Sequence, residues 1–186
     1  MNSSKRPELS HDDARTFDGT PVFCTLEGPR KLLRLCGTFD IKVGGQTVKW
    51  DNDPRGRWWF TEQAFLEILD MATNMATDAA AAVSAGPDLL NHIMSWVVRE
   101  KSAVCADWNS LANIYSLNIP TGEKISCWAG HIRAQPLFSK SDPHQRKSAL
   151  MLPGGLVQYV IDGLQDKRYD GWVRAERPLR VAVGTA

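Results

Sequence analysis

The sequence predicts an α+β domain in which a small mixed sheet is flanked by helices. Short apolar runs that contain β-branched residues, separated by turn residues, occupy residues 22–50 and return at residues 124–129. Between these two regions, apolar residues recur at helical spacing. Because the helices are gathered between groups of strands instead of following each strand in turn, the pattern favours α+β over regular βαβ alternation.

The composition fits one folded domain with a polar segment before it. The chain has 186 residues, of which 43% are hydrophobic and 23% charged, close to the averages for globular domains. Residues 1–20 are polar and lack periodicity, which predicts a mobile N-terminal tail. The predicted domain therefore spans residues 21–186.

The first structured elements are predicted to be strands. The runs FDIKV and QTVKW flank Gly44 and Gly45, which is typical of a β-hairpin connection. No apolar run approaches the roughly 20 residues that a membrane-spanning helix needs, so no membrane span is expected.

Helices are predicted for the middle of the chain. Thr61 can cap a helix whose first turn carries Glu62, and Gly86 and Pro87 end the helical pattern. A second helix is predicted to begin at Asp88, and a short third helix to cover 107–115.

The last third returns to strands. Residues 124–129 are predicted as a strand that ends at Gly130, and residues 138–148 as a polar loop. Beyond the loop, a helix is predicted for 156–164 and a closing strand for 179–183.

Charge and cysteine usage limit the classes of function. The net charge is +1, with 22 basic and 21 acidic residues, so the whole-molecule field does not favour avid binding of nucleic acid. The 4 cysteines lack close pairs and no basic-then-apolar leader precedes them, which predicts free thiols in a reducing cytosol. Zinc-site spacing and a Walker-type phosphate loop are also absent from the sequence.

One segment has the residue types of a phosphate-binding turn. Gly130, His131 and Arg133 follow the strand predicted for 124–129. Glycine permits close approach of a backbone, arginine offers a fork of donors to phosphate oxygens, and histidine can move a proton near neutral pH. The alternative is an ordinary turn with a structural arginine.

Two residues that flank this segment are candidates for further roles in phosphate chemistry. Glu123 is a candidate ligand for Mg²⁺, and Gln135 is a candidate for orienting an attacking water molecule. The alternative, which residues of these types favour, is that each is a solvated surface residue.

A second candidate surface lies in the polar loop. His144, Arg146 and Lys147 can contact a DNA backbone through its phosphates, although loops commonly carry such residues. The 7 tryptophans can stack on bases, but residues of this type more often fill a core or an interface.

The strand followed by Gly130-His131-Ile132-Arg133 resembles the nucleotide-binding motif of the ParB/sulfiredoxin superfamily. ParB proteins carry Gly-Glu-Arg-Arg at this point and sulfiredoxins carry Gly-Cys-His-Arg, so Gly130 and Arg133 match both. The resemblance implies a ParB/sulfiredoxin-like fold over 21–186 that binds a nucleotide, ATP, with Mg²⁺.

Chain length, tryptophan content and the position of the motif are most similar to the plasmid fertility-inhibition (oncogenic suppression) members of that superfamily. This resemblance implies ATPase and DNase activities that block conjugation, the transfer of DNA through a type IV secretion system. The implied partners are DNA, a nucleotide and the coupling protein of the secretion system.

Departures from the motif limit which activities of the superfamily are expected of this chain. His131 stands where sulfiredoxins have their cysteine and where ParB proteins have an acidic residue, and no helix-turn-helix follows. Sulfinic-acid reduction and centromere binding are therefore not expected. Two alternatives stay open: a non-catalytic protein that inhibits the coupling protein by occlusion, and an ADP-ribosyltransferase that uses Arg133, for which the Ser-x-Ser and glutamate pattern is lacking.

Overall fold

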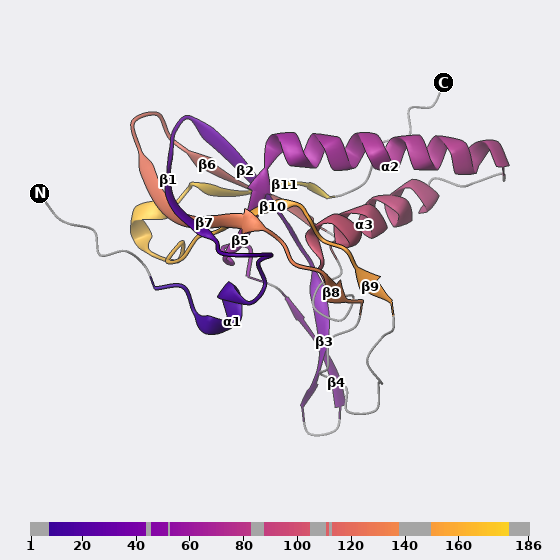
Figure 1. Ribbon diagram of the computed structural model, residues 1–186, viewed down its shortest axis with the longest axis horizontal. Helices are drawn as coiled ribbons and strands as arrows, with labels where there is room; N and C mark the ends of the chain where they lie inside the picture. Colours follow the sequence, from indigo (N-terminus) through magenta and orange to yellow (C-terminus); the bar gives the residue numbers. More distant parts are fainter. Residues whose placement is uncertain are drawn as a thin grey trace, which may run out of the picture.

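The computed structural model describes residues 8–43, 46–51, 53–82, 88–104, 111, 113–137 and 150–178. Its centre is a seven-stranded sheet in the order β1-β7-β10-β5-β2-β6-β11 (Figure 1). Every pairing in this sheet is antiparallel, so the α+β class is confirmed and the predicted mixed sheet is wrong. The strands are β1 (Val22–Glu27), β2 (Arg30–Cys36), β5 (Trp58–Thr61), β6 (Asn113–Ile119), β7 (Lys124–His131), β10 (Val157–Val160) and β11 (Val173–Pro178).

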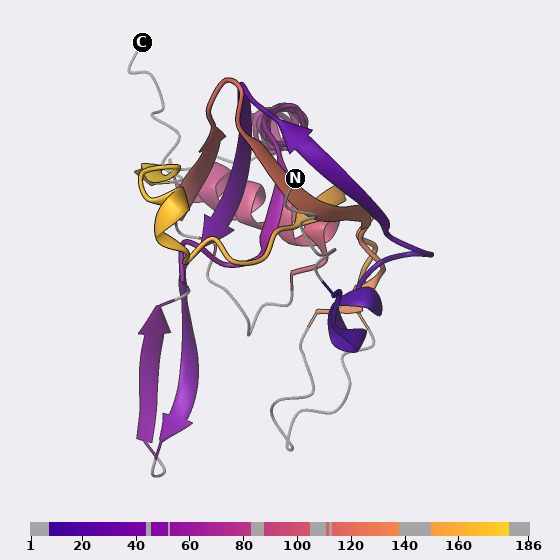
Figure 2. The same ribbon diagram turned by 90° about the vertical axis from the view of Figure 1, so that its left-hand side faces the viewer.

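The sheet curls, so that an arm formed by β1 and β7 faces an arm formed by β2 and β6 (Figure 2). The turns at the end of the two arms touch, since the Gly28 amide donates to the Glu123 carbonyl at 3.0 Å. A Cβ atom on Gly28 would lie 1.8 Å from the Pro120 carbonyl oxygen, so this approach requires glycine. Side chains from both arms fill the concave face, and they include Leu26, Leu32, Trp59, Leu117, Ile119, Ile125, Cys127 and Ile161.

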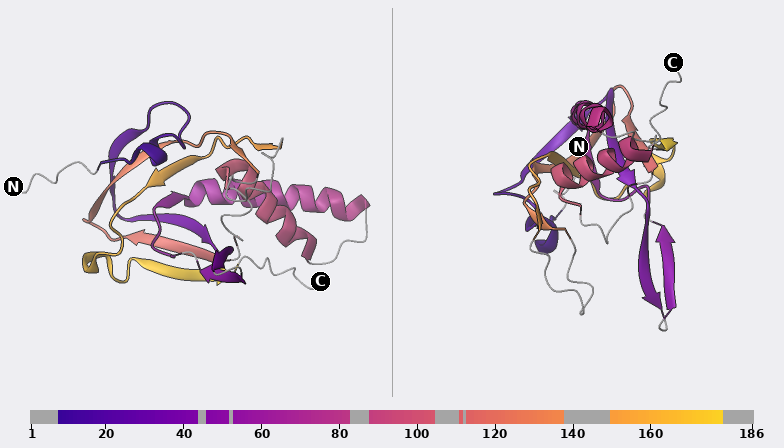
Figure 3. Two further views of the ribbon diagram at one scale, coloured as in Figure 1. Left: turned by 90° about the horizontal axis from the view of Figure 1, so that it is seen from below. Right: turned by 90° about the vertical axis from the view of Figure 1, so that its right-hand side faces the viewer.

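Two helices cover the other face, α2 (Glu62–Ala82) and α3 (Asp88–Ser102), which pack against one another (Figure 3). Both were predicted, and the Thr61 cap is confirmed because the Ala64 amide donates to its Oγ1 atom at 3.0 Å. Neighbouring residues of β2 belong to core clusters on opposite faces of the sheet: Leu32 faces the concave side, while Leu33 packs under the helices. Within the described residues, no helix is long and apolar enough to cross a membrane.

Two small sheets and one 3₁₀ turn lie outside the main sheet. The predicted hairpin is confirmed as β3 (Thr38–Val43) and β4 (Gln46–Asp51), which project away from the main sheet (Figure 1). A second two-stranded sheet pairs β8 (Gln135–Pro136) with β9 (Met151–Leu152). One 3₁₀ turn, η1, covers Lys167–Tyr169.

Two segments predicted as helices are strands where the structure describes them. The helix predicted for 107–115 ends within β6, whose residues from Asn113 onward pair with β2. The helix predicted for 156–164 contains β10, which is held between β5 and β7. In both, the apolar spacing fits a helix locally, but pairing with two neighbouring strands decides the structure. The closing strand predicted for 179–183 lies outside the described residues, and β11 ends just before it.

Residues 8–20, predicted as part of a mobile tail, instead pack against the domain. Ser10 caps the short helix α1 (His11–Ala14), accepting from the Asp13 amide at 3.1 Å. Phe17 is only 2% exposed and pairs with Ile132 through a β-bridge. This aromatic side chain anchors the segment in a third core cluster, with Ala103, Trp128, Ile132, Leu152 and Val160.

Candidate functional site

The segment from Gly130 to Arg133 is extended, although the sequence predicted a strand that ends at Gly130 and a phosphate-binding turn after it. Strand β7 continues to His131, and Gly130 pairs with Gln158 of β10. The next amides are already occupied: Ile132 donates to the Leu156 carbonyl at 3.0 Å, and Arg133 donates to the Thr16 carbonyl at 2.8 Å. These amides therefore do not form a cradle for phosphate.

Gly130 is explained by packing. A Cβ atom at this position would lie 2.7 Å from Cδ1 of Phe17, closer than side-chain carbons approach one another. The glycine thus makes room for the aromatic ring that anchors residues 8–20.

The side chains that follow Gly130 fall into two groups. His131 and Arg133 are exposed, whereas Ile132 is 5% exposed and Gln135 is half-buried. The Nδ1 atom of His131 lies 2.8 Å from the Gly155 carbonyl oxygen, so Nδ1 carries a hydrogen and donates it. Arg133 forms no ion pair with any described residue.

The other predicted site residues are not brought to this segment. Glu123 lies in the turn before β7, at the opposite end of the strand from His131, and about 26 Å separates the two backbones at strand spacing. No three His, Cys, Asp or Glu side chains among the described residues gather in a group that could hold a metal ion. His144, Arg146 and Lys147 lie outside the described residues.

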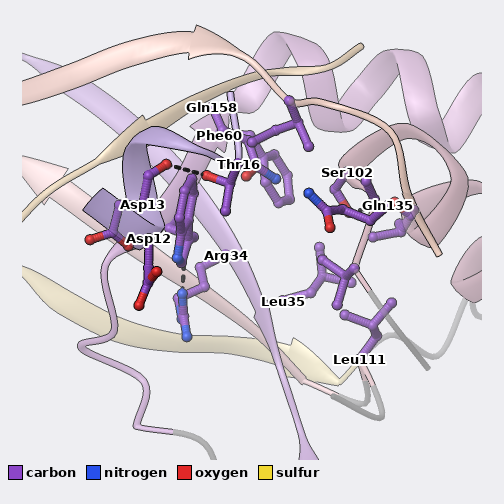
Figure 4. A pocket seen from close by; sticks show the side chains of 15 residues that line it. Asp12, Asp13, Thr16, Arg34, Leu35, Phe60, Ser102, Leu111, Gln135 and Gln158 are labelled. Atoms are coloured by element: carbon purple, nitrogen blue, oxygen red, sulfur yellow. Dashed lines mark hydrogen bonds between the residues drawn. The ribbon is translucent and has the colours of Figure 1, made fainter. Parts of the chain in front are cut away.

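A cavity of about 320 Å³ opens where two core clusters adjoin, between residues 12–16, strands β2 and β5, and the end of α3 (Figure 4). Ile132 and Gln135 belong to its wall, so the predicted segment does contribute to it. Its apolar lining is formed by Leu35, Trp58, Phe60, Val98, Ala103, Val104, Leu111 and Ile132, and its polar lining by Asp12, Asp13, Thr16, Arg34, Ser102, Gln135 and Gln158.

Two glutamine amides reach this cavity without a protein partner. Gln158 is 5% exposed and Gln135 is half-buried, and neither side chain forms a hydrogen bond with a described residue. In Figure 4, Gln135 lies on the side of Ser102, and Gln158 lies on the side of Thr16 and Phe60. Both amides line the cavity, so their donors and acceptors are open to a ligand bound there.

Two hydroxyl groups add acceptors to the cavity wall. Ser102 Oγ donates to the Val98 carbonyl at 2.5 Å, and Thr16 Oγ1 donates to the Asp13 carbonyl at 2.6 Å. Each hydroxyl has its hydrogen engaged and keeps oxygen lone pairs that can accept from a ligand.

A cation lies at the other end of the cavity. Arg34 donates from Nη1 to the Trp58 carbonyl at 3.0 Å, and its Nε atom lies 2.9 Å from Cys36 Sγ. It has no carboxylate partner among the described residues, whereas Asp13 is paired with Arg57 at 2.6 Å between Oδ2 and Nη1. The positive charge of Arg34 is thus held in place and is not neutralised by an ion pair with any residue that the structure describes.

Sequence reasoning missed Arg34 and Gln158 as site residues, although each carried a signal. Arg34 interrupts the apolar run of β2, and Gln158 interrupts that of β10. A polar residue inside a strand that is buried on both faces needs a partner, and such a residue points to a site.

Comparison with protein-family models, with curated proteins and with solved structures finds no match to this chain.

Proposed function

We propose that this chain binds a small planar ligand with hydrogen-bonding edges, a nucleobase in a nucleoside or nucleotide, in the cavity between residues 12–16 and α3. The observation that carries the proposal is the pair of amides, Gln135 and Gln158, that face an apolar space without partners among the described residues. An amide both donates and accepts, which matches the mixed edge of a heterocycle.

The rest of the cavity supports a ligand of this class. Its volume of about 320 Å³ is at the lower end of small-molecule sites, which are mostly apolar with a few placed polar groups. Trp58 and Phe60 offer aromatic surfaces to a planar ring. Arg34 offers a positive charge to a carbonyl or anionic substituent at the far end.

A titration tests the proposal. We expect saturable binding of at least one member of a panel of ATP, CTP, adenosine and cytidine, measured by calorimetry with the whole chain. Replacing Gln158 by Leu removes one hydrogen bond to the ligand, and we expect affinity to fall about 10-fold. Gln63→Leu is the matched control, because Gln63 is exposed on α2 and pairs with Glu67 at 3.1 Å. Absence of binding by the whole panel, or an equal loss in Gln63→Leu, would refute the assignment.

A second candidate function rests on the resemblance to the ParB/sulfiredoxin superfamily and on Arg133. We propose for it a plasmid fertility-inhibition factor that hydrolyses ATP and cleaves DNA, with Arg133 contacting a phosphate. The supporting observation is that Arg133 is exposed and has no ion-pair partner among the described residues, which leaves its guanidinium accessible to an anion.

Phosphate release and plasmid nicking test this second candidate. We expect Arg133→Ala to lose both activities, while Arg15→Ala, which removes another exposed arginine, keeps them. Equal activity in the two variants would remove Arg133 from the mechanism. If Arg133→Ala still blocks conjugative transfer and still captures the coupling protein, inhibition is by occlusion and not by catalysis.

A further inference from the structure

Two cysteine side chains face one another across neighbouring strands, on the concave side of the sheet. Cys24 of β1 and Cys127 of β7 are directly opposite in the antiparallel register. Their Sγ atoms are 3.2 Å apart. Cys127 is 1% exposed, whereas Cys24 is half-buried and reachable from solvent.

The backbone geometry at this pair permits a disulfide. Directly opposed residues of antiparallel strands have Cα atoms about 4.5–5.5 Å apart, which lies within the range of disulfide-bonded cysteines. Both side chains point to the same face because the residues are paired in register. The sulfur atoms need to approach by only about 1 Å, which side-chain rotation can supply.

The surroundings give the two thiols different roles. Burial raises the pKa of Cys127, and its hydrogen bond with Cys24 raises it further. Cys127 therefore keeps its proton at neutral pH and is shielded from reagents in solution. Cys24 is the half-buried member of the pair, so an oxidant in solution reaches its sulfur first.

We propose that Cys24 and Cys127 form a peroxide-reactive dithiol site that cycles between two thiols and a cross-strand disulfide. The inference does not depend on the ligand proposed for the cavity. Cys24 is the residue that reacts with the oxidant. Cys127 is the residue that then forms the disulfide with the oxidised Cys24.

The chemistry balances with hydrogen peroxide as the two-electron oxidant. The Cys24 thiolate attacks one peroxide oxygen, the O–O bond breaks, and hydroxide leaves and takes up a proton, so that Cys24 becomes a sulfenic acid. The sulfur of Cys127 then attacks the sulfur of Cys24, the S–O bond breaks, and the released hydroxide takes the Cys127 proton as water. In total, two thiols and one peroxide give one disulfide and two waters. A dithiol reductant returns both thiols by exchange.

The site has a structural consequence for the cavity. Residues 12–16 of the cavity wall lead into β1, and Ile132 and Gln135 follow β7. A covalent bond between the strands would hold the edge strand β1 to β7 and so fix the two wall segments relative to one another.

Peptide mapping of the whole chain tests the proposal. The reduced protein is treated with hydrogen peroxide, remaining thiols are alkylated, and tryptic peptides are identified by mass. We expect a cross-link between peptides 16–30 and 125–133, which carry Cys24 and Cys127, and a loss of two hydrogen masses from the protein. Dithiothreitol is expected to reverse both changes. A linkage to peptide 35–42, which carries Cys36, or an unlinked Cys24 with added oxygen, would overturn the proposal.

Single variants separate the two roles. In Cys127→Ser we expect dimedone to trap a sulfenic acid on Cys24, and in Cys24→Ser we expect Cys127 to resist both peroxide and alkylation in the folded protein. Cys36→Ser is the matched control, since Cys36 is also buried at 2% exposure but lies outside the pair, and its cross-link between 24 and 127 should persist. Rapid oxidation of Cys127 in Cys24→Ser would contradict the assigned order. The wild-type peptide map decides the main question even if a variant does not fold.

Discussion

Replacement of Gly130 by alanine distinguishes a packing role for this glycine from a phosphate-binding role. The new Cβ atom would lie 2.7 Å from Cδ1 and 3.2 Å from Cε1 of Phe17. Carbon atoms normally pack at about 3.5–4.0 Å, so the shorter contact falls roughly 1 Å inside the optimum. Phe17 has little room to yield, because it is 2% exposed and its ring centroid lies 5.6 Å from that of Trp58.

We expect Gly130→Ala to lower the free energy of unfolding by about 1–3 kcal/mol, the usual cost of one added methyl group in a packed core. Urea unfolding followed by tryptophan fluorescence measures this change, and the midpoint should fall while the slope with denaturant stays constant. Because typical stabilities are only about 5–15 kcal/mol, the shift is easily resolved.

A double-mutant cycle supplies the control. In a Phe17→Ala background the ring atoms that clash are gone, so the added cost of Gly130→Ala should fall below about 0.5 kcal/mol. Two results would refute the reasoning: a change below about 0.5 kcal/mol in the wild-type background, or the same cost with and without the Phe17 ring.

Three further perturbations follow from the described contacts. Thr61→Ala removes the cap of α2 and should cost about 1 kcal/mol in urea unfolding, with Thr61→Ser retaining most of the stability. Arg57→Gln breaks the ion pairs with Asp13 and Asp162 and should cost about 1–3 kcal/mol, with increased amide hydrogen exchange at residues 10–17; unchanged exchange there would contradict the role of the Asp13 ion pair in holding this segment. A hydrogen bond from Ser116 lowers the pKa of Glu176 below its usual 4.5, so its stabilising contribution is present above that pH and is lost as the pH falls through the lowered value. Glu176→Gln should therefore flatten the acid limb of stability against pH, and an unchanged limb would contradict this.

The elements that sequence predicts well are those with a local cause. The start of α2 was predictable because Thr61 can accept from an amide three residues later, whatever the rest of the chain does. The β3–β4 hairpin was predictable because two strand-forming runs flank two glycines. In each case the information lies within a few neighbouring residues.

The elements that sequence predicts poorly depend on distant partners. Val157 to Val160 have apolar spacing that fits a helix. This segment is nevertheless a strand, because its backbone pairs with β5 on one side and with β7 on the other. Phe17 lies in a polar segment, and its anchoring role follows from a space that Gly130 leaves more than a hundred residues later. The cavity likewise joins side chains from separate parts of the chain. Its polar residues can therefore be noticed one by one in the sequence, but their proximity in space cannot be predicted from it.

The extended form of the segment around Ile132 also separates the two functional proposals. A turn would have directed Gly130, His131 and Arg133 at one phosphate, but in the structure the exposed side chains of His131 and Arg133 are separated by buried Ile132, which lines the cavity. Ile132 and Gln135 both line the cavity, whereas Arg133 is exposed, so a ligand in the cavity meets Gln135 and Gln158, and an anion on Arg133 approaches from solvent. The two sites should therefore act independently: Gln158→Leu should weaken nucleoside binding without changing the effect of Arg133→Ala, and their effects on nucleotide affinity should add. Strong non-additivity would mean that one ligand contacts both Gln158 and Arg133, and it would refute the independence of the two sites.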